Sequence, residues 1–143
     1  MKIAEVMTRD PEWINPEATI EDAACMMRGL DTGFLPVGDG RRFQGILTDR
    51  DITIRAVAEG LDATTAPVEG VMTPSVIYCY EDQDIQRAAD LMAENQVRRL
   101  IVLNRDKKLT GVVSLGDLCL RCGDHEMAGD VLDDISHLPI TVS

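Results

Sequence analysis

Aromatic residues are scarce in this chain: its 143 residues include one tryptophan, two tyrosines and two phenylalanines. Hydrophobic residues nevertheless make up 45% of the sequence, so the core has to be built from Ile, Leu, Val, Met and Ala. Aliphatic side chains of this size suit thin α/β layers. Length and composition therefore predict an α+β protein, with one globular domain or two half-size units that share one core.

Positive charge is also in short supply, because 14 Lys and Arg stand against 25 Asp and Glu, for a formal net charge of −11. A phosphate backbone attracts clustered Lys and Arg, so this balance excludes a general affinity for nucleic acid and disfavours binding to anionic membranes. No apolar run approaches the roughly 18 residues that cross a bilayer, and residues 1–5 lack the apolar stretch of a signal peptide. We expect a cytoplasmic protein with no nucleic acid or membrane among its partners.

The four cysteines, two of which are Cys25 and Cys79, form no recognisable framework. Their spacing is irregular and disulfides are rare in the cytosol, so we expect no disulfide. Cys119 and Cys122, followed by His125, look like half of a zinc site. A structural zinc site needs a second pair of Cys or His residues at comparable spacing. We therefore predict no metal site, and ordinary helix packing explains these cysteines.

Catalytic motifs are missing as well. No nucleophile has a base at a recognisable spacing, and the chain has no glycine-rich loop of the Walker type. His125 and His137 lie late in the chain without a visible partner. We expect no enzymatic activity and no catalytic residue.

What the sequence does contain is an internal repeat. At a constant shift of 65 residues, segment 6–37 aligns with 71–102, and both segments open with Val-Met-Thr. After one inserted residue, the run Gly-Ile-Leu-Thr-Asp-Arg-Asp at 45–51 lies over Gly-Val-Val-Ser-Leu-Gly-Asp at 111–117. Copies of this size would be marginal alone, so we expect them to fuse into one body. The duplication predicts a pseudo-twofold axis, with two related clefts between the copies as the natural binding sites.

Each copy shows the element order β-α-β-β-α. In the first copy, apolar residues recur at helical spacing from Ile20, after a capping box of Thr19 and Asp22. Two apolar β runs follow, joined by the turn Gly38-Asp39-Gly40. The predicted strands are 13–16, 34–37 and 43–47, then 76–80, 100–103 and 109–113, and the predicted helices are 20–29, 49–59, 85–94 and 115–122. The predicted division of the chain is copy 1 at 1–60, a linker at 61–70, copy 2 at 71–123 and a tail at 124–143 that could be helical.

Thr48-x-x-Asp51 and Ser114-x-x-Asp117 stand at equivalent positions, where a predicted strand ends and a helix begins. One interpretation is a capping box, in which hydroxyl and carboxylate satisfy backbone N–H groups at the helix start. The other is a ligand site, in which the hydroxyl and the helix start meet a phosphate while the carboxylate accepts both hydroxyls of a ribose. The recurrence of the pair in both copies favours a functional role.

Taken together, these motifs resemble a tandem cystathionine-β-synthase (CBS) domain pair. The resemblance is carried by the runs 45–51 and 111–117 and by the twin Val-Met-Thr openings, and it covers about residues 1–123. The segments 47–51 and 96–99 resemble in particular small stand-alone bacterial CBS-pair proteins, some of them of hypoxic or stress-response type. The resemblance implies a regulatory module that binds an adenosine-containing ligand, such as AMP, ADP, ATP or S-adenosylmethionine, in the clefts between the repeats.

The resemblance also implies a role for each site residue. Asp51 and Asp117 would hold ribose hydroxyls, and Thr48 and Ser114 would meet phosphate or ribose oxygens. The adenine would lie between apolar strand edges, flanked by backbone from both copies. The flanking residues are Thr8, Gly33 and Phe34 for the Asp117 cleft, and Thr73 and Ile77 for the Asp51 cleft.

Arg98 and Arg99 distinguish the two copies. They precede a predicted strand, where members of the family often carry basic phosphate ligands, although a solvated strand end explains them equally well. Gly33 and Phe34 occupy the equivalent positions of the first copy and cannot pair with anions. We therefore expect unequal occupation, with the Asp117 cleft preferred.

The resulting hypothesis is a non-enzymatic sensor for signal transduction, in which the adenosine ligand is a regulator and no cofactor is required. By resemblance, the protein would form a flat homodimer through its apolar helix faces, and it could act on a further, unknown protein. Two alternatives from other classes stay open. One is a structural or interaction dimer with vestigial clefts, and the other is a zinc or redox protein that uses Cys119, Cys122 and His125.

Overall fold

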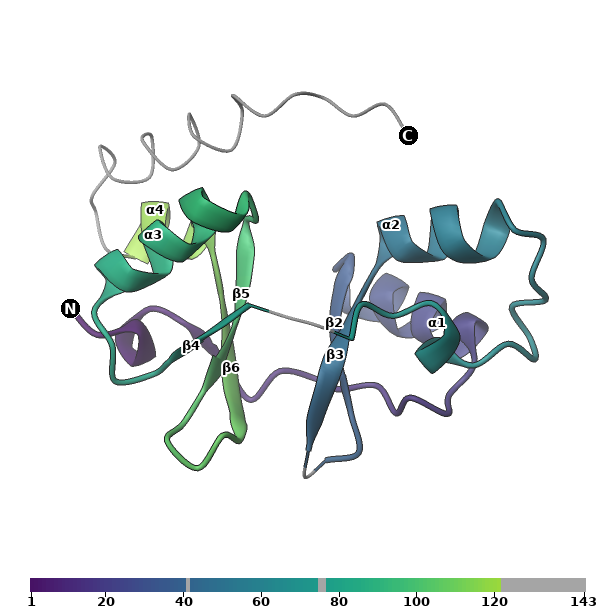
Figure 1. The fold of residues 1–143 in the computed structure, drawn as a ribbon, viewed down its shortest axis with the longest axis horizontal. Helices are drawn as coiled ribbons and strands as arrows, with labels where there is room; N and C mark the ends of the chain where they lie inside the picture. Colours follow the sequence, from purple (N-terminus) through teal and green to yellow (C-terminus); the bar gives the residue numbers. More distant parts are fainter. Residues whose placement is uncertain (41, 75–76, 122–143) are drawn as a thin grey trace. The chain divides into compact units, whose positions relative to one another are not determined.

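The computed structural model describes residues 1–40, 42–74 and 77–121. Its contacts divide the chain into two compact units, and Figure 1 labels the α-helices and strands β2 to β6. The first, here called the Asp51 unit, is Pro11–Val76. The second, the Asp117 unit, combines Met1–Asp10 with Ile77–Ser143. Each unit therefore contains one of the two Thr/Ser-x-x-Asp motifs.

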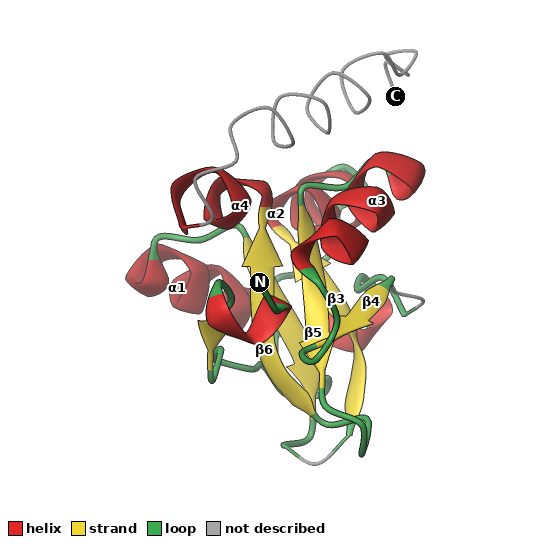
Figure 2. Ribbon diagram, turned by 90° about the vertical axis from the view of Figure 1, so that its left-hand side faces the viewer, coloured by secondary structure: helices red, strands yellow, loops and turns green. Residues whose placement is uncertain are grey.

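The Asp117 unit is built on a four-stranded sheet in the order β1-β6-β5-β4. Strands β4 and β5 are parallel, whereas the other neighbours are antiparallel. Helices α3 and α4 pack against β5 and β6 (Figure 2). The elements are the 3-10 helix η1 (Ile3–Glu5), β1 (Thr8–Arg9), β4 (Tyr78–Tyr80), α3 (Ile85–Asn95), β5 (Arg99–Leu103), β6 (Leu109–Ser114) and α4 (Leu115–Arg121).

The Asp51 unit repeats this plan with a shorter sheet. Its two strands form an antiparallel hairpin, and single bridges add Ile14 beside Val37 and Thr73 beside Ile46. The elements are α1 (Ile20–Leu30), β2 (Phe34–Gly38), β3 (Phe43–Thr48), α2 (Asp49–Asp51), the π-helix η2 (Ile52–Val57) and the 3-10 helix η3 (Val68–Gly70).

The opening segment of each sequence copy joins the sheet that contains the other copy's motif. Thr8 pairs with Val112 in β6, and Thr73 pairs with Ile46 at the equivalent position of β3. The compact units therefore cut across the boundaries of the sequence copies. Because the two openings are alike, an alignment of the copies carries no information about which sheet each opening joins.

Glycine at the start of each repeated motif permits this pairing. A Cβ atom at Gly45 would lie 2.5 Å from the carbonyl oxygen of Thr73, and one at Gly111 would lie 2.8 Å from that of Thr8. Both distances are too short for a non-bonded contact, so only glycine lets the backbone of the opening segment come this close.

The buried side chains are aliphatic, as the composition predicts, but each unit buries a core of its own, whereas one shared core was expected. The larger fully buried side chains include Ile3, Met92, Leu100, Ile101 and Leu118 in the Asp117 unit, and Ile20, Leu35, Val37, Leu47 and Val68 in the Asp51 unit. The predicted mixed α+β architecture with two repeats is confirmed.

The predictions for individual helices and strands agree with the structure to different degrees. The capping box of α1 forms as expected, because the backbone N–H of Asp22 donates to Thr19 Oγ1 at 3.1 Å and that of Thr19 donates to Asp22 Oδ2 at 3.2 Å. The strand predicted at 13–16 is reduced to the bridge at Ile14. The helix predicted at 49–59 starts with one α turn and continues as the π-helix η2. The predicted tail helix lies outside the described residues.

Candidate functional site

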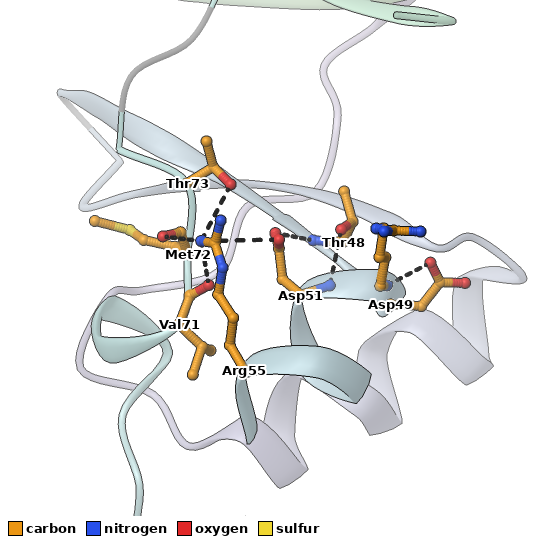
Figure 3. Close-up of polar contacts among 8 residues, drawn as sticks. Thr48, Asp49, Asp51, Arg55, Val71, Met72 and Thr73 are labelled. Atoms are coloured by element: carbon orange, nitrogen blue, oxygen red, sulfur yellow. Dashed lines mark hydrogen bonds and ion pairs between the residues drawn. The ribbon is translucent and has the colours of Figure 1, made fainter. Parts of the chain in front are cut away.

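Thr48 and Asp51 form the first of two equivalent corners, here called the Asp51 corner, where β3 ends and α2 begins. The backbone N–H of Asp51 donates to Thr48 Oγ1 at 3.1 Å, and the backbone N–H of Thr48 donates to Asp51 Oδ2 at 3.0 Å (Figure 3). This reciprocal pair is a capping box. The Asp51 side chain is thereby fixed at the end of the strand.

Ser114 and Asp117 form the second corner, the Asp117 corner, between β6 and α4. The backbone N–H of Asp117 donates to Ser114 Oγ at 3.0 Å, and that of Ser114 donates to Asp117 Oδ2 at 2.9 Å. The capping interpretation of the sequence is therefore correct for both motifs. Capping uses one carboxylate oxygen in each corner, so it fixes the side chain without consuming its whole hydrogen-bonding capacity.

Asp51 is the more deeply buried carboxylate, with 9% of the residue exposed. A buried charge is stable only when it has a partner, and Arg55 supplies one: its Nη1 lies 3.9 Å from Asp51 Oδ1. The same nitrogen donates to the carbonyl oxygens of Val71 and Met72, each at 3.2 Å, and to Thr73 Oγ1 at 3.5 Å (Figure 3). Arg55 thus joins the Asp51 corner to the opening segment of the second copy.

Arg55 was not among the predicted site residues. A signal was present, because the shift of 66 residues that aligns Asp51 with Asp117 also aligns Arg55 with Arg121. The pattern Asp-x-x-x-Arg therefore occurs in both copies.

The two corners differ in charge at a second pair of equivalent positions. In the Asp51 unit, the backbone N–H of Asp49 donates to the carbonyl oxygen of Gly33 at 2.9 Å. In the Asp117 unit, the backbone N–H of Leu115 donates to that of Arg98 at 2.8 Å. The Asp49 carboxylate occupies the space where a side chain at position 33 would start, since its Oδ2 would lie 2.5 Å from a Cβ there. A glycine and a carboxylate thus stand where the Asp117 unit has an arginine and a leucine.

The remaining predicted site residues divide between the units. Arg98 and Arg99 are exposed, and Arg99 pairs with Ser114 across β5 and β6. Thr8 is exposed in β1 of the same unit. Phe34 is buried and pairs with Thr48.

Three of the residues that were expected to flank the adenine do not belong to the same unit as the aspartate of their predicted cleft. Gly33 and Phe34 belong to the Asp51 unit and Ile77 belongs to the Asp117 unit, whereas Thr8 and Thr73 share a unit with their aspartates.

The described cysteines differ in exposure. Cys79 is 1% exposed, and burial raises its pKa to about 12 against a smaller opposing effect of Arg87. Cys25 is exposed and Cys119 is half-buried. Cys122 and His125 lie outside the described residues. Within the described part of the chain, no three His, Cys, Asp or Glu side chains gather as metal ligands.

Comparison with known proteins gives these corners a context. The family model of the CBS domain matches residues 3–57 and 68–123. The chain belongs to the CBS-domain family. The CBS domain-containing protein YhcV of Bacillus subtilis is 36% identical to this CBS pair over 135 residues, which are 94% of this chain and 95% of YhcV.

Two solved structures are similar to the CBS pair. Hypoxic Response Protein I, crystallised with two coordinated zinc ions, is 34% identical with a TM-score of 0.77, over 85% of this chain and 98% of that one. The CBS domain pair of MJ0100, in complex with 5′-methylthioadenosine and S-adenosyl-L-methionine, is 23% identical with a TM-score of 0.74, over 86% and 96% of the two chains. At that identity the second likeness establishes the fold alone. Among the described helices of the CBS pair, none is long and apolar enough to cross a membrane.

Proposed function

We propose that this CBS pair is a non-enzymatic regulatory module that binds an adenosine-containing ligand at the Asp51 and Asp117 corners. The observation that carries the proposal is the repeated geometry, in which one carboxylate oxygen accepts a backbone N–H of the strand end in each corner. A carboxylate that is fixed in this way presents acceptor sites for both hydroxyls of a ribose. Membership of the CBS family and the adenosyl ligands of MJ0100 support the same ligand class.

The two corners are suited to ligands of different charge. Arg98 and Arg99 stand beside the Asp117 corner, because Arg99 pairs with Ser114. At the Asp51 corner, Gly33 replaces Arg98 and the Asp49 carboxylate lies against it. We therefore assign a phosphorylated adenosine to the Asp117 corner and an uncharged or cationic adenosyl group to the Asp51 corner.

Calorimetric titration of Asp117→Asn and Asp51→Asn with AMP tests this assignment. Asn keeps a side-chain oxygen for the capping bond but loses the charge that attracts ribose hydroxyls. A hydrogen bond to a charged group is worth about 1.5 to 3 kcal/mol, so we expect Asp117→Asn to weaken AMP binding by at least about tenfold. Asp51→Asn should weaken it less.

Asp22→Asn is the matched control, because Asp22 belongs to the capping box of α1 and not to either corner. It should bind AMP as the wild type does. A larger loss in Asp51→Asn than in Asp117→Asn would reverse the assignment of the two corners.

The competing function, an interaction protein with vestigial clefts, is distinguished by thermal melting with AMP, ATP and S-adenosylmethionine. A ligand at about 100 times its dissociation constant adds about 2.7 kcal/mol of stability. No shift with any of the three would favour the competing function. Mass spectrometry of small molecules that co-purify with the protein would identify the ligand directly.

A further inference from the structure

Arg55 makes its contacts through a single atom. Nη1 faces two backbone carbonyls, the Thr73 hydroxyl and the second carboxylate oxygen of Asp51, all within 3.9 Å. The two carbonyls and the Thr73 hydroxyl accept hydrogen bonds from this nitrogen, which carries two hydrogens. Asp51 Oδ1, at 3.9 Å, forms an ion pair with the same group. Because one guanidinium group makes all four contacts, the positions of Asp51 and of the backbone depend on each other.

We propose that Arg55 is a positioning residue of the Asp51 corner, through which Asp51 and the backbone of Val71–Thr73 hold each other in place. The Thr48 bond fixes Asp51 Oδ2, and Arg55 orients Oδ1. The held segment is paired with β3 by two bonds, from the Ile46 N–H to the Thr73 carbonyl at 3.1 Å and from the Thr73 N–H to the Ile46 carbonyl at 2.8 Å. Arg55 thus secures both sides of this corner.

The contact joins an exposed group to a buried one, because 49% of the Arg55 side chain is exposed and 11% of the Asp51 side chain. Asp51 is 9% exposed, whereas exposed ion pairs between long side chains contribute little. Arg55 lies within the π-helix η2, which starts directly after the capped turn. Short π-helical stretches are frequent at functional sites.

The proposal also assigns a regulatory consequence, which rests on the proposed function. Four residues after Thr73 comes Ile77, where the second segment of the Asp117 unit begins. If the held segment favours a correctly placed Asp51, a ligand on Asp51 must favour the held segment by the same free energy. Ligand occupancy is thereby coupled to the part of the chain that leads into the other unit.

A double-mutant cycle of Arg55→Gln and Asp51→Asn tests the mutual hold without any ligand. The measurement is amide hydrogen exchange at Thr73 and Ile46 in the ligand-free full-length protein. We expect each single variant to exchange about tenfold faster than the wild type, and the double variant to exchange no faster than Arg55→Gln alone. Arg28→Gln removes the same charge from the end of α1 in the same unit and should leave both amides unchanged, while Arg55→Lys should restore part of the protection.

Unchanged exchange in Arg55→Gln, or effects of the two single variants that simply add, would overturn the proposal. This outcome does not depend on whether any nucleotide binds.

A second experiment, on ligand binding, distinguishes a positioning role of Arg55 from direct contact with a phosphate. The probes are adenosine, which is uncharged, and AMP. We expect Arg55→Gln to weaken both at the Asp51 corner by the same factor of about ten, with the Asp117→Asn background used to isolate that corner. A loss confined to AMP would make Arg55 a phosphate ligand and overturn the positioning role. Wild-type protein that binds neither probe, and neither ATP nor S-adenosylmethionine, would refute the proposed function, while the exchange cycle would still decide the role of Arg55.

Discussion

Asp51 and Asp117 each give one carboxylate oxygen to the backbone N–H of the last strand residue. The capping role and the proposed ribose role are therefore compatible in one side chain, because a carboxylate has about four acceptor sites. Ala at either position would remove both roles at once, and it would cost about 0.5 to 2 kcal/mol through the lost cap. Asn separates the two roles, which is why it is the more informative substitution.

Burial also determines the reactivity of individual cysteines. The thiolate is the reactive form, and the pKa of Cys79 rises from 9.0 to about 12 in the folded protein because burial penalises the charged form. A raised pKa means that this thiol contributes its full stability below about pH 9, the value for the unfolded chain, and loses it as the pH rises toward about 12.

We predict that iodoacetamide at about pH 8 alkylates Cys25 well before Cys79. Cys25 is exposed, whereas Cys79 is neutral and its Sγ donates to the Ile101 carbonyl oxygen at 3.8 Å. Peptide mass spectrometry of quenched time points gives both rates, and urea should abolish the difference. Labelling of Cys79 at the rate of Cys25 in the native protein would contradict this burial.

At the scale of elements, the opening segments bring together motifs that lie far apart in the sequence. The Val-Met-Thr segments do not form the first strand of their own copy. Each pairs with the strand that ends in a corner, Thr8 with β6 and Thr73 with β3. In each unit, the opening segment of the other copy therefore lies beside the corner. The glycine that starts the repeated motif and the aspartate that ends it both belong to this arrangement.

Gly45→Ala should destabilise the protein by about 1 to 3 kcal/mol, because its methyl group would lie 2.5 Å from the Thr73 carbonyl oxygen. Gly29→Ala is the matched control, since a Cβ at this position in α1 has no atom within 4 Å. The control should stabilise by roughly 0.5 to 1 kcal/mol, the usual gain for Gly to Ala in a helix. Urea denaturation of both variants provides the comparison, and equal midpoints would show that the segment can move away from β3 at little cost.

At the scale of the whole molecule, much of the apolar helix surface that was expected to form a dimer interface is used inside the units. Met27, Leu91, Met92 and Leu118 are all buried there. Ile54 and Leu120, which occupy equivalent positions of the two copies, remain 38% and 86% exposed. A homodimer interface therefore has to rest on a smaller set of residues.

We predict that Leu120→Asp converts a homodimer into a monomer, because it places a charge on α4 at the most exposed of these leucine and isoleucine side chains. Leu30→Asp at the end of α1, where the leucine is 45% exposed, should keep the dimer mass. Light scattering at micromolar concentration measures both. A wild type that is already monomeric would refute the dimer.

Local spacing explains what could be predicted from the sequence. The corners and the α1 cap follow from residues three positions apart, which any helix start brings together. Arg55 escaped prediction because its partners in the opening segment are 16 to 18 residues away and two of them are backbone carbonyls, which every residue type possesses. The alignment of the copies does not predict which strand each opening segment joins, because two like segments can be exchanged without changing it. The resemblance to CBS pairs did assign Thr8 to Asp117 and Thr73 to Asp51, and each shares a unit with that aspartate.

The net charge of −11 affects how the whole molecule can bind a nucleotide. It repels a polyanion at long range, and this repulsion is screened over about 10 Å at 0.1 M salt. In the proposed function, Arg98 and Arg99 act by contact instead, and charge-assisted hydrogen bonds to a phosphate are worth about 1.5 to 3 kcal/mol each. Adenosine offers no group for these bonds. We therefore predict that AMP binds more tightly than adenosine, and that AMP and ADP bind at least as well as ATP.

Titrations of the four ligands against wild type and Arg98→Gln/Arg99→Gln test this prediction. Lys107→Gln/Lys108→Gln is the matched control, because it removes the same charge from exposed residues of the β5–β6 turn. The arginine variant should lose the preference for AMP over adenosine, and the lysine variant should keep it. If the wild type binds adenosine and AMP equally, or if the arginine variant keeps its preference, these arginines do not contact the ligand. The Asp117 corner would then be suited to an uncharged adenosyl group, as we propose for the Asp51 corner.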